Sequence, residues 1–481
     1  MSATGRGGVE PDSPATAAVS ATPTPGMPTR DRRLLTAGLV LIVTMVAFEA
    51  LAVATILPLV EADLGDLHLY GWVFSAFFLG NLVGIVLAGR AADRTRLVVP
   101  FAAGVVLFAA GLVVGASAPT MLVLVLGRGL QGLGAGALPA VAYVCIGRSY
   151  PPERRPQMFA LLSTAWVVPS VIGPAIAGFV GETLGWRWVF AGLLPLVAVI
   201  GAVVVGAVWH LDAPDVGGPV PVSVRDALVV AVSGAAVLAA FGADEWWSAG
   251  VLLVTGLAAG LPAFARLTPA GTLRLARGLP AAVGLRGVLS FSFFAADAYV
   301  PYTLTTVRGY PPTTAGLALT AGALAWAAGS WAQARWVHRR GPRALVRFGY
   351  ALLAVVTTGF TVVASSAVPV TVALVVWGLA GLAMGLAYPS LSVAVLGFAP
   401  PGREGSATAG LQLSETLGVA LGTGTAGALV GFAAGAGWDP STGPSLVFAM
   451  AGAVACAGLL LSMRLPDQLP REGDHTRGLR A

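Results

Sequence analysis

The sequence contains little charge. Only 10% of its 481 residues are Asp, Glu, Lys or Arg, whereas a soluble globular domain carries about 25%. The mean hydropathy is +0.82, and long stretches lack charged residues entirely. A membrane-spanning helix needs about 20 mostly apolar residues, and the chain supplies such runs repeatedly. The composition therefore excludes a soluble protein and predicts an all-α polytopic membrane protein.

Lysine is absent, so all 28 basic residues are arginines. Without lysine the chain has no phosphate-binding Gly-Lys loop, which excludes ATP as the direct energy source. The net charge of +6 does not indicate a nucleic-acid partner, because the arginines stand in short loops beside apolar runs. Arginines in such loops set membrane topology.

Cysteine and histidine are scarce. Cys145 and Cys456 lie far apart inside apolar runs and form no disulfide or metal pattern. The four histidines are scattered near loops and chain ends, without a His-Glu-x-x-His arrangement. We therefore expect no metal, no cofactor and no catalytic residues, and a membrane-embedded enzyme becomes the less favoured alternative.

Apolar runs long enough to form spanning helices occur fourteen times. They lie at about 34–59, 71–90, 97–117, 120–146, 157–181, 187–209, 227–243, 248–265, 280–306, 313–337, 344–365, 368–397, 405–434 and 443–463. The seventh and eighth are the weakest, because they are short and separated only by residues 244–247.

The distribution of charge over the loops predicts the orientation. If the N-terminus is cytoplasmic, the cytoplasmic loops hold clusters of arginines, as at 90–96 and 335–347, while the opposite loops hold mostly acids, such as Glu61 and Asp63. This pattern follows the positive-inside rule along the whole chain. It requires the seventh and eighth helices to span as a pair or not at all. We expect a multi-pass protein of the cell (inner) membrane with both termini in the cytoplasm.

The two halves of the chain repeat each other. An offset of 249 maps Gly132 on Gly381 and Gly136 on Gly385, and an offset of 245 maps Gly84 on Gly329. An offset of 248 places Glu49 on Asp297. Such halves suit alternating access around a central site. The predicted organisation is a disordered cytoplasmic tail (1–33), a six-helix bundle (34–209), a linker with two inserted helices (210–279), a second six-helix bundle (280–464) and a cytoplasmic tail (465–481).

Three motifs lie on this framework. Residues 89–96 (Gly-Arg-Ala-Ala-Asp-Arg-Thr-Arg) join the second and third helices, residues 128–136 (Arg-Gly-Leu-Gln-Gly-Leu-Gly-Ala-Gly) belong to the fourth, and residues 169–178 contain Gly173-Pro174 and Gly178 of the fifth. These motifs resemble those of the major facilitator superfamily, in particular its fourteen-helix drug:proton antiporter group. The likeness covers about residues 34–464.

The resemblance implies a major facilitator fold and assigns roles to motif residues. Asp93 would form an ion pair or contact a helix N-terminus that holds one gate state, although the arginines around it also serve topology. Arg128 would take part in proton transfer, and the fifth-helix motif would seal the site against proton leak. The second half keeps Arg339 and Gly341 but has His338 in place of the Asp. The predicted gating and conformational residues are Gly89, Asp93, Arg94, Gly173, Pro174, Gly178, Arg339 and Gly341.

Three carboxylates lie inside predicted spans, namely Glu49, Asp297 and Glu415. Acids at this depth are rare and usually face the interior of a bundle. With Arg128 they form the predicted proton-coupling set. Asp297 is also a candidate anchor for cationic substrates, and Glu415 a candidate for hydrogen bonding between helices.

A substrate cavity would be lined by aromatic and amide side chains. The candidates are Trp72, Phe74, Gln131, Trp166, Phe294, Tyr299, Trp377, Tyr388 and Gln412. The predicted function is proton-coupled export of small amphiphilic molecules by a monomer in the lipid bilayer, with small-molecule substrate and protons as its partners. Uptake by proton symport remains the alternative, because only the fifth-helix motif argues for export.

Overall fold

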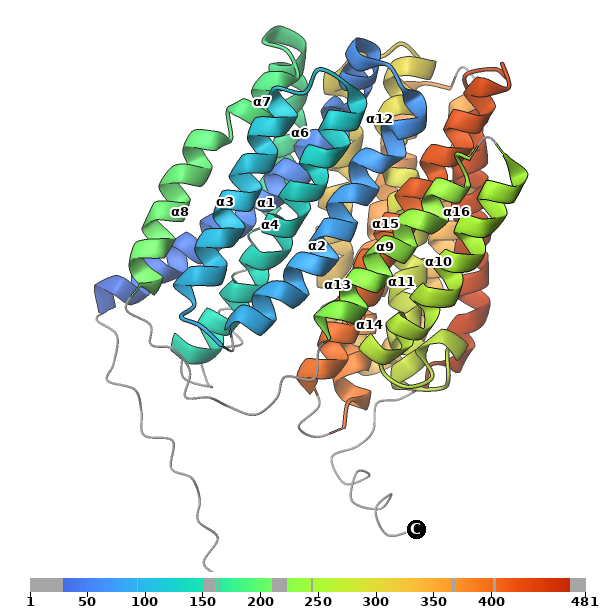
Figure 1. Ribbon diagram of the computed structural model, residues 1–481. Coiled ribbons are helices and arrows are strands. Elements are labelled where there is room, and N and C mark those ends of the chain that lie inside the picture. Colours follow the sequence, from blue (N-terminus) through green and yellow to red (C-terminus); the bar gives the residue numbers. More distant parts are fainter. Residues whose placement is uncertain are drawn as a thin grey trace, which may run out of the picture.

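The computed structural model describes residues 29–92, 94–149, 161, 165, 167–209, 223–243, 245–365, 368–400 and 404–467. Within these residues every regular element is helical, and long helices run side by side through the molecule (Figure 1). Helices satisfy their own backbone hydrogen bonds, as a chain in hydrocarbon must. The all-helical prediction is confirmed.

The helices follow the apolar runs of the sequence. They are α1 (Thr29–Leu64), α2 (Tyr70–Ala92), α3 (Val98–Ala116), α4 (Met121–Ser149), α6 (Val167–Thr183), α7 (Arg187–Ala191), α8 (Leu194–Val208), α9 (Val224–Ala240), α10 (Trp246–Leu267), α11 (Leu279–Asp297), α12 (Val300–Tyr302), α13 (Pro312–Ser365), α14 (Val370–Phe398), α15 (Glu404–Gly435) and α16 (Thr442–Leu461).

Among the described residues, 11 helices are long and apolar enough to cross a membrane. Three further predicted spans correspond to α6, to α9 and to the first part of α13. Helix α13 joins two spans through Gly341, whose φ of 74° breaks the helix in a region that favours glycine. Each of the fourteen predicted spans therefore has a helical counterpart among the described residues, which for the fifth span is the helix that begins at Val167.

The sequence repeat appears again in the packing of the helices. A Cβ atom on Gly132 of α4 would overlap the carbonyl oxygen of Phe77 of α2, and one on Gly381 of α14 would overlap the carbonyl oxygen of Gly322 of α13. These two contacts are related by the offsets of 249 and 245 that relate the halves in sequence. The same close helix crossing, which only glycine permits, is thus built twice.

The two halves also meet each other through equivalent contacts. The Cβ position of Gly71 in α2 is 2.5 Å from the carbonyl oxygen of Thr423 in α15, and that of Gly316 in α13 is 2.8 Å from the carbonyl oxygen of Pro174 in α6. Both contacts lie near the starts of α2 and α13. We call this end of the molecule the acid-rich end, because Glu61, Asp63 and Asp66 lie there. The opposite end, where α2 is followed by α3 and where α13 is broken at Gly341, is the arginine-rich end.

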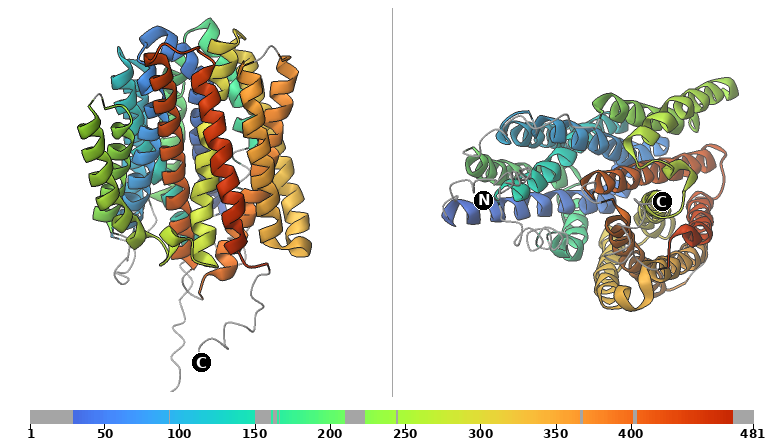
Figure 2. Two further views of the ribbon diagram at one scale, coloured as in Figure 1. Left: turned by 90° about the vertical axis from the view of Figure 1, so that its right-hand side faces the viewer. Right: turned by 90° about the horizontal axis from the view of Figure 1, so that it is seen from below.

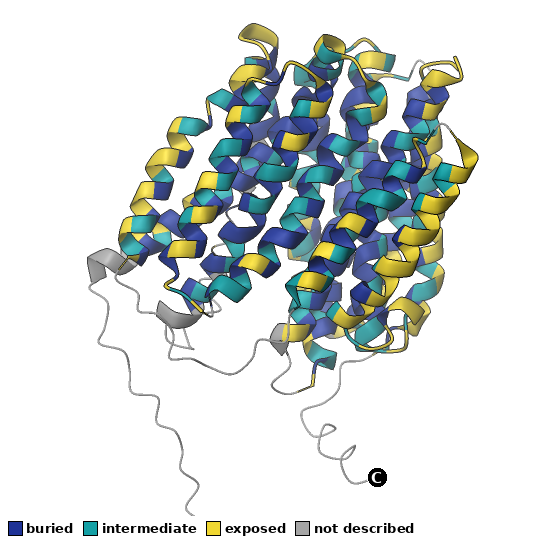
Figure 3. Ribbon diagram, viewed as in Figure 1, coloured by how far each residue is buried: buried dark blue, intermediate teal, exposed yellow. Residues whose placement is uncertain are grey.

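Helix α9 covers the seam between α2 and α15. The Cβ position of Gly234 in α9 lies 3.0 Å from Leu79 of α2 and 3.7 Å from Leu417 of α15, so α9 contacts both halves. Helix α10 packs on α9 and points outward, with Trp246 85% exposed. Figure 2 shows the pair at the side of the molecule, and Figure 3 shows the exposed outer faces of α8 and α10, which suit contact with lipid.

The two inserted helices, α9 and α10, are joined at the arginine-rich end by a salt bridge. Arg266 of α10 donates from Nε (3.1 Å) and Nη2 (2.6 Å) to Oδ1 of Asp226 at the start of α9. These hydrogen bonds from the Arg266 guanidinium hold the pKa of the Asp226 carboxyl below its usual range. Ser223 caps the same helix by accepting from the backbone N–H of Asp226.

Candidate functional site

A buried ion pair joins α1 to α4. The Nη1 atom of Arg128 donates to Oε1 of Glu49, and the two side chains are 2% and 1% exposed. An uncompensated arginine at this depth is costly, about 2.5–3.5 kcal/mol on insertion scales, and the carboxylate of Glu49 supplies the compensation. The structure therefore brings together two residues of the predicted proton-coupling set.

Three further groups complete the surroundings of this pair. Gln131, one turn after Arg128, accepts from Arg128 Nη1 at 3.0 Å and donates to Glu49 Oε1 at 3.2 Å. The Nε atom of Arg128 donates to the carbonyl of Val73 at 3.3 Å, and its guanidinium lies 4.2 Å from the ring centroid of Phe77. Oε2 of Glu49 is buried and has no hydrogen-bond partner among the described residues. One acceptor of the site is therefore left open.

At the equivalent positions of the second half the pair has different chemistry. Asp297 ends α11, as the repeat mate of Glu49, and its Oδ1 accepts from the indole Nε1 of Trp377 at 3.2 Å. Trp377 is offset by 249 from Arg128, so a neutral donor replaces the arginine. Phe293 stacks on Trp377 with ring centroids 5.4 Å apart. No arginine is paired with Asp297 in the part of the chain that the structure describes.

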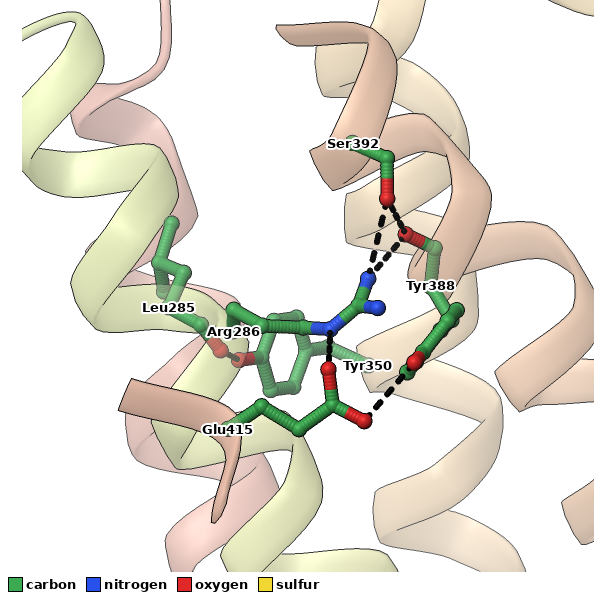
Figure 4. Close-up of polar contacts among 6 residues, drawn as sticks. All are labelled: Leu285, Arg286, Tyr350, Tyr388, Ser392 and Glu415. Carbon is green, nitrogen blue, oxygen red and sulfur yellow. Dashed lines mark hydrogen bonds and ion pairs between the residues drawn. The ribbon is translucent and has the colours of Figure 1, made fainter. Parts of the chain in front are cut away.

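Glu415 belongs to a second polar cluster (Figure 4). Its Oε2 accepts from Arg286 Nε at 3.0 Å and its Oε1 from the hydroxyl of Tyr388 at 2.7 Å. Arg286 also donates from Nη1 to the carbonyl of Tyr388 at 2.5 Å and to Ser392 Oγ at 3.3 Å. The cluster thus links α11, α14 and α15.

A row of partly exposed aromatic rings leads to this cluster. Phe78 of α2 and Phe294 of α11 have centroids 6.5 Å apart, Phe294 and Trp326 of α13 lie 6.4 Å apart, and Trp326 meets Tyr388 edge-on at 5.2 Å. The row spans both halves of the molecule. Such spacings are those of favourable aromatic pairs.

The other predicted cavity residues fall into two groups. Trp72 and Gln412 are partly exposed, like Phe294 and Tyr388. Those buried among packed helices are Phe74, Gln131, Tyr299 and Trp377. Trp166 lies outside the described residues.

The first loop motif is described only in part. Gly89 has open space around its Cβ position and Arg94 is exposed, while Asp93, the residue predicted to hold a gate state, lies outside the described residues. In the second half, Arg339 is exposed and Gly341 forms the kink of α13.

A carboxylate reaches this second loop from the far end of the chain. Asp467 accepts from Arg343 Nη1 at 2.6 Å through Oδ1, and its carbonyl oxygen is packed against Gly341. The acid that the second loop motif lacks is thus supplied by the segment after α16.

The fifth-helix motif lies where the two halves touch. Pro174 contacts Gly316, and the Cβ position of Gly178 is 3.2 Å from the backbone of Thr313. Glu182 accepts from the backbone N–H of Thr313 at 2.8 Å. The Gly-Pro motif therefore forms part of the interface between α6 and the start of α13.

Sequence reasoning missed Arg286, Phe78 and Trp326. Arg286 carries the signal that singled out Arg128, a charge within a predicted span, and it is 3% exposed. Phe78 and Trp326 carry no such signal, because aromatic residues are common in membrane helices and only the packing selects these two.

Comparisons with known proteins agree with this architecture. The family model described as Major Facilitator Superfamily matches residues 38–423 and 283–480. A probable multidrug-efflux transporter of Mycobacterium tuberculosis is 28% identical over 454 residues, which cover 89% of this chain and 94% of the relative.

Two solved structures share the fold. The D-xylose–proton symporter has a TM-score of 0.66 at 14% identity and covers 91% of this chain and 98% of its own. The peptide transporter POT in complex with sulfate has a TM-score of 0.66 at 16% identity and covers 89% of this chain and 93% of its own. With its repeated helical halves, its buried intramembrane charges and a family match over most of its length, this chain belongs to the major facilitator superfamily and is a membrane transporter, not an enzyme.

Proposed function

We propose that this transporter exports small amphiphilic molecules in exchange for protons, with Glu49 as the group that carries the proton. The observation that supports this role is the buried Glu49–Arg128 pair, in which Oε2 of Glu49 has no partner among the described residues. Because Oε2 accepts no hydrogen bond, a proton can bind there without displacing a donor of the pair.

Coupling needs a group whose partners change between conformations. Glu49 and Gln131 share Arg128 across α1 and α4, so a rearrangement of these helices alters the charge compensation of the carboxylate. A proton binds Glu49 more tightly when Arg128 moves away and less tightly when it returns. Antiport follows if substrate entry favours the arrangement in which Arg128 compensates Glu49.

The proposed substrate class follows from the groups that remain accessible. Asp297 is partly exposed and is bonded by a neutral donor. Its partner Trp377 stacks on Phe293, and Phe293 meets Trp326 of the aromatic row edge-on with ring centroids 5.5 Å apart. Aromatic faces with a carboxylate attract organic cations. Amphiphilic and often cationic compounds fit this combination.

Export is favoured over uptake by two findings. The relative that covers most of the chain is named a multidrug-efflux transporter, and the Gly-Pro motif of α6 lies at the contact between the halves. Proton symport for uptake is the second candidate, since one of the solved structures with this fold is a proton symporter. We further propose that the protein works as a monomer in the cell membrane with both termini in the cytoplasm and without a cofactor.

Transport of ethidium, a permanent organic cation, into inverted membrane vesicles tests this function. Wild-type protein should accumulate ethidium when the vesicle interior is acidic and stop when a protonophore collapses the gradient. Glu49→Gln and Arg128→Ala should lose gradient-driven accumulation. Thr55→Val, a buried substitution in the same helix, is the matched control and should retain it. Gradient-independent accumulation by wild type would exclude antiport.

A further inference from the structure

Arg286 and Glu415 form an ion pair in the second half that has no counterpart in the first. The positions that correspond to them by the offsets of 248 and 249 are Gly38 and Trp166. The pair is therefore not part of the repeat that relates the two halves. Its chemistry belongs to this half alone.

The two charges of the pair differ in accessibility. The side chain of Arg286 is 3% exposed and that of Glu415 is 22% exposed. Glu415 points from α15 toward Arg286 of α11 and Tyr388 of α14 (Figure 4). The guanidinium of Arg286 stacks over the ring of Tyr388, the last member of the aromatic row.

The charges of Arg286 and Glu415 are compensated by their immediate hydrogen-bond partners. Both oxygens of Glu415 accept hydrogen bonds, one from the arginine and one from Tyr388. Arg286 is held in place by the carbonyl of Tyr388 and by Ser392. A ligand on the aromatic row therefore meets a positive and a negative group whose fields largely cancel.

We propose that Arg286 and Glu415 together set the charge preference of the substrate site, each by compensating the other. Removal of the carboxylate leaves an arginine beside the aromatic row and favours an organic anion. Removal of the arginine leaves a second carboxylate and favours an organic cation. This inference rests on the proposed function for the location of the substrate along the row.

A purely structural role for the pair makes a different prediction. If it only joins α11 to α14 and α15, the loss of either partner weakens binding of every ligand in the same direction. A role in charge preference makes the two single variants move in opposite directions. The sign of the change thus separates the two roles.

The experiment measures binding of tetraphenylphosphonium and tetraphenylborate, two ions of similar shape and opposite charge. The full-length protein in lipid nanodiscs is studied by equilibrium dialysis, with empty nanodiscs as the blank. Glu415→Gln should shift the ratio of the two affinities toward the anion by about tenfold or more, and Arg286→Gln toward the cation by a similar factor. Such a factor is about the size expected for one uncompensated charge several ångströms from a bound ion at an effective dielectric constant of about 20.

Three further variants serve as controls for this interpretation. The double variant Arg286→Gln/Glu415→Gln leaves no unpaired charge and should return to the wild-type ratio. Tyr350→Phe removes only the hydrogen bond from the Tyr350 hydroxyl to the carbonyl of Leu285; it keeps both charges and every partner of Glu415 and should also keep the ratio. Should the single variants fail to fold, Ser392→Asp adds a carboxylate beside Arg286 without removing either partner, and it should shift the ratio toward the cation.

An unchanged affinity ratio in the folded charge variants, or a shift of both single variants in the same direction, would overturn the proposal. The assay uses no proton gradient. A failure of proton coupling therefore leaves this result standing, and an unchanged ratio leaves gradient-driven export untouched.

Discussion

Asp297 accepts a hydrogen bond from the indole of Trp377 at 3.2 Å, at the two positions where the first half of the molecule places Glu49 and Arg128. The second half keeps a hydrogen bond to the carboxylate at these positions, but its donor is neutral and not positively charged. Glu49 thus has an arginine as its partner and Asp297 has a neutral donor, which separates their proposed roles: Glu49 for the proton and Asp297 for the cationic part of a substrate.

Trp377→Arg tests this separation. The substitution gives Asp297 a counter-ion like that of Glu49, so the carboxylate is no longer free to compensate a bound cation. Ethidium binding should weaken by about tenfold or more, where a factor of ten corresponds to about 1.4 kcal/mol. Trp377→Phe removes only the hydrogen bond, worth about 0.5–1.5 kcal/mol, and serves as the control for the size of the ring. Unchanged ethidium affinity in folded Trp377→Arg protein would argue against Asp297 as the cation anchor.

Arg128→Met should destabilise the protein more than the double variant Glu49→Gln/Arg128→Met. Breaking a buried ion pair by removing one partner costs about 3–5 kcal/mol, because the remaining charge is buried alone, whereas replacing both partners is often close to neutral. Thermal unfolding in detergent measures the difference. If the single and double variants unfold at the same temperature, Glu49 is not charged in the wild-type protein under those conditions.

Gly132→Ala and Gly381→Ala should have similar effects, since each adds a methyl group against a backbone carbonyl of the facing helix. Overpacking of this kind typically costs about 1–3 kcal/mol. Gly359→Ala, which meets open space, is the matched control and should be neutral or slightly stabilising. A harmless Gly381→Ala beside a damaging Gly132→Ala would mean that the two halves do not share this crossing.

The Asp226–Arg266 pair predicts a small dependence of stability on pH. The pKa of Asp226 is lowered by Arg266 in the folded protein, so the pair stabilises the fold above the unfolded pKa of about 4, and this contribution is lost as the pH falls. Because Arg266 is largely exposed, solvent screens the pair and its contribution at pH 7 is expected to be small. The acid-induced decrease in unfolding temperature should therefore be slightly smaller in Asp226→Asn. An equal decrease in both proteins would show that the pair does not stabilise the insertion.

Much of the fold could be predicted from the sequence because membrane helices obey simple rules. Length, apolarity and arginine placement predict the spans, and the glycine offsets predict that the two halves repeat each other. The contact between Glu49 and Arg128 was also predictable, since the charge of Arg128 at that depth needs a compensating group.

The remaining features depend on three-dimensional packing. No pattern indicates that Asp467 reaches Arg343 across 124 residues, or that Trp326 lies between Phe294 and Tyr388. The sequence also does not predict that α9 packs over the contact between α2 and α15, because an apolar helix can pack against any neighbour. Arg286 is the exception, since its position inside an apolar run was visible in the sequence.

Proton release on ligand binding tests the central claim most directly. Purified protein in weakly buffered detergent solution is mixed with tetraphenylphosphonium, which has no proton of its own to lose, and the pH is followed with an indicator dye. We predict that the wild-type protein and Glu415→Gln release protons when the cation binds, and that Glu49→Gln binds the cation without releasing them. Release from Glu49→Gln equal to that from the wild type would contradict the account, because the exchanged proton would then reside elsewhere.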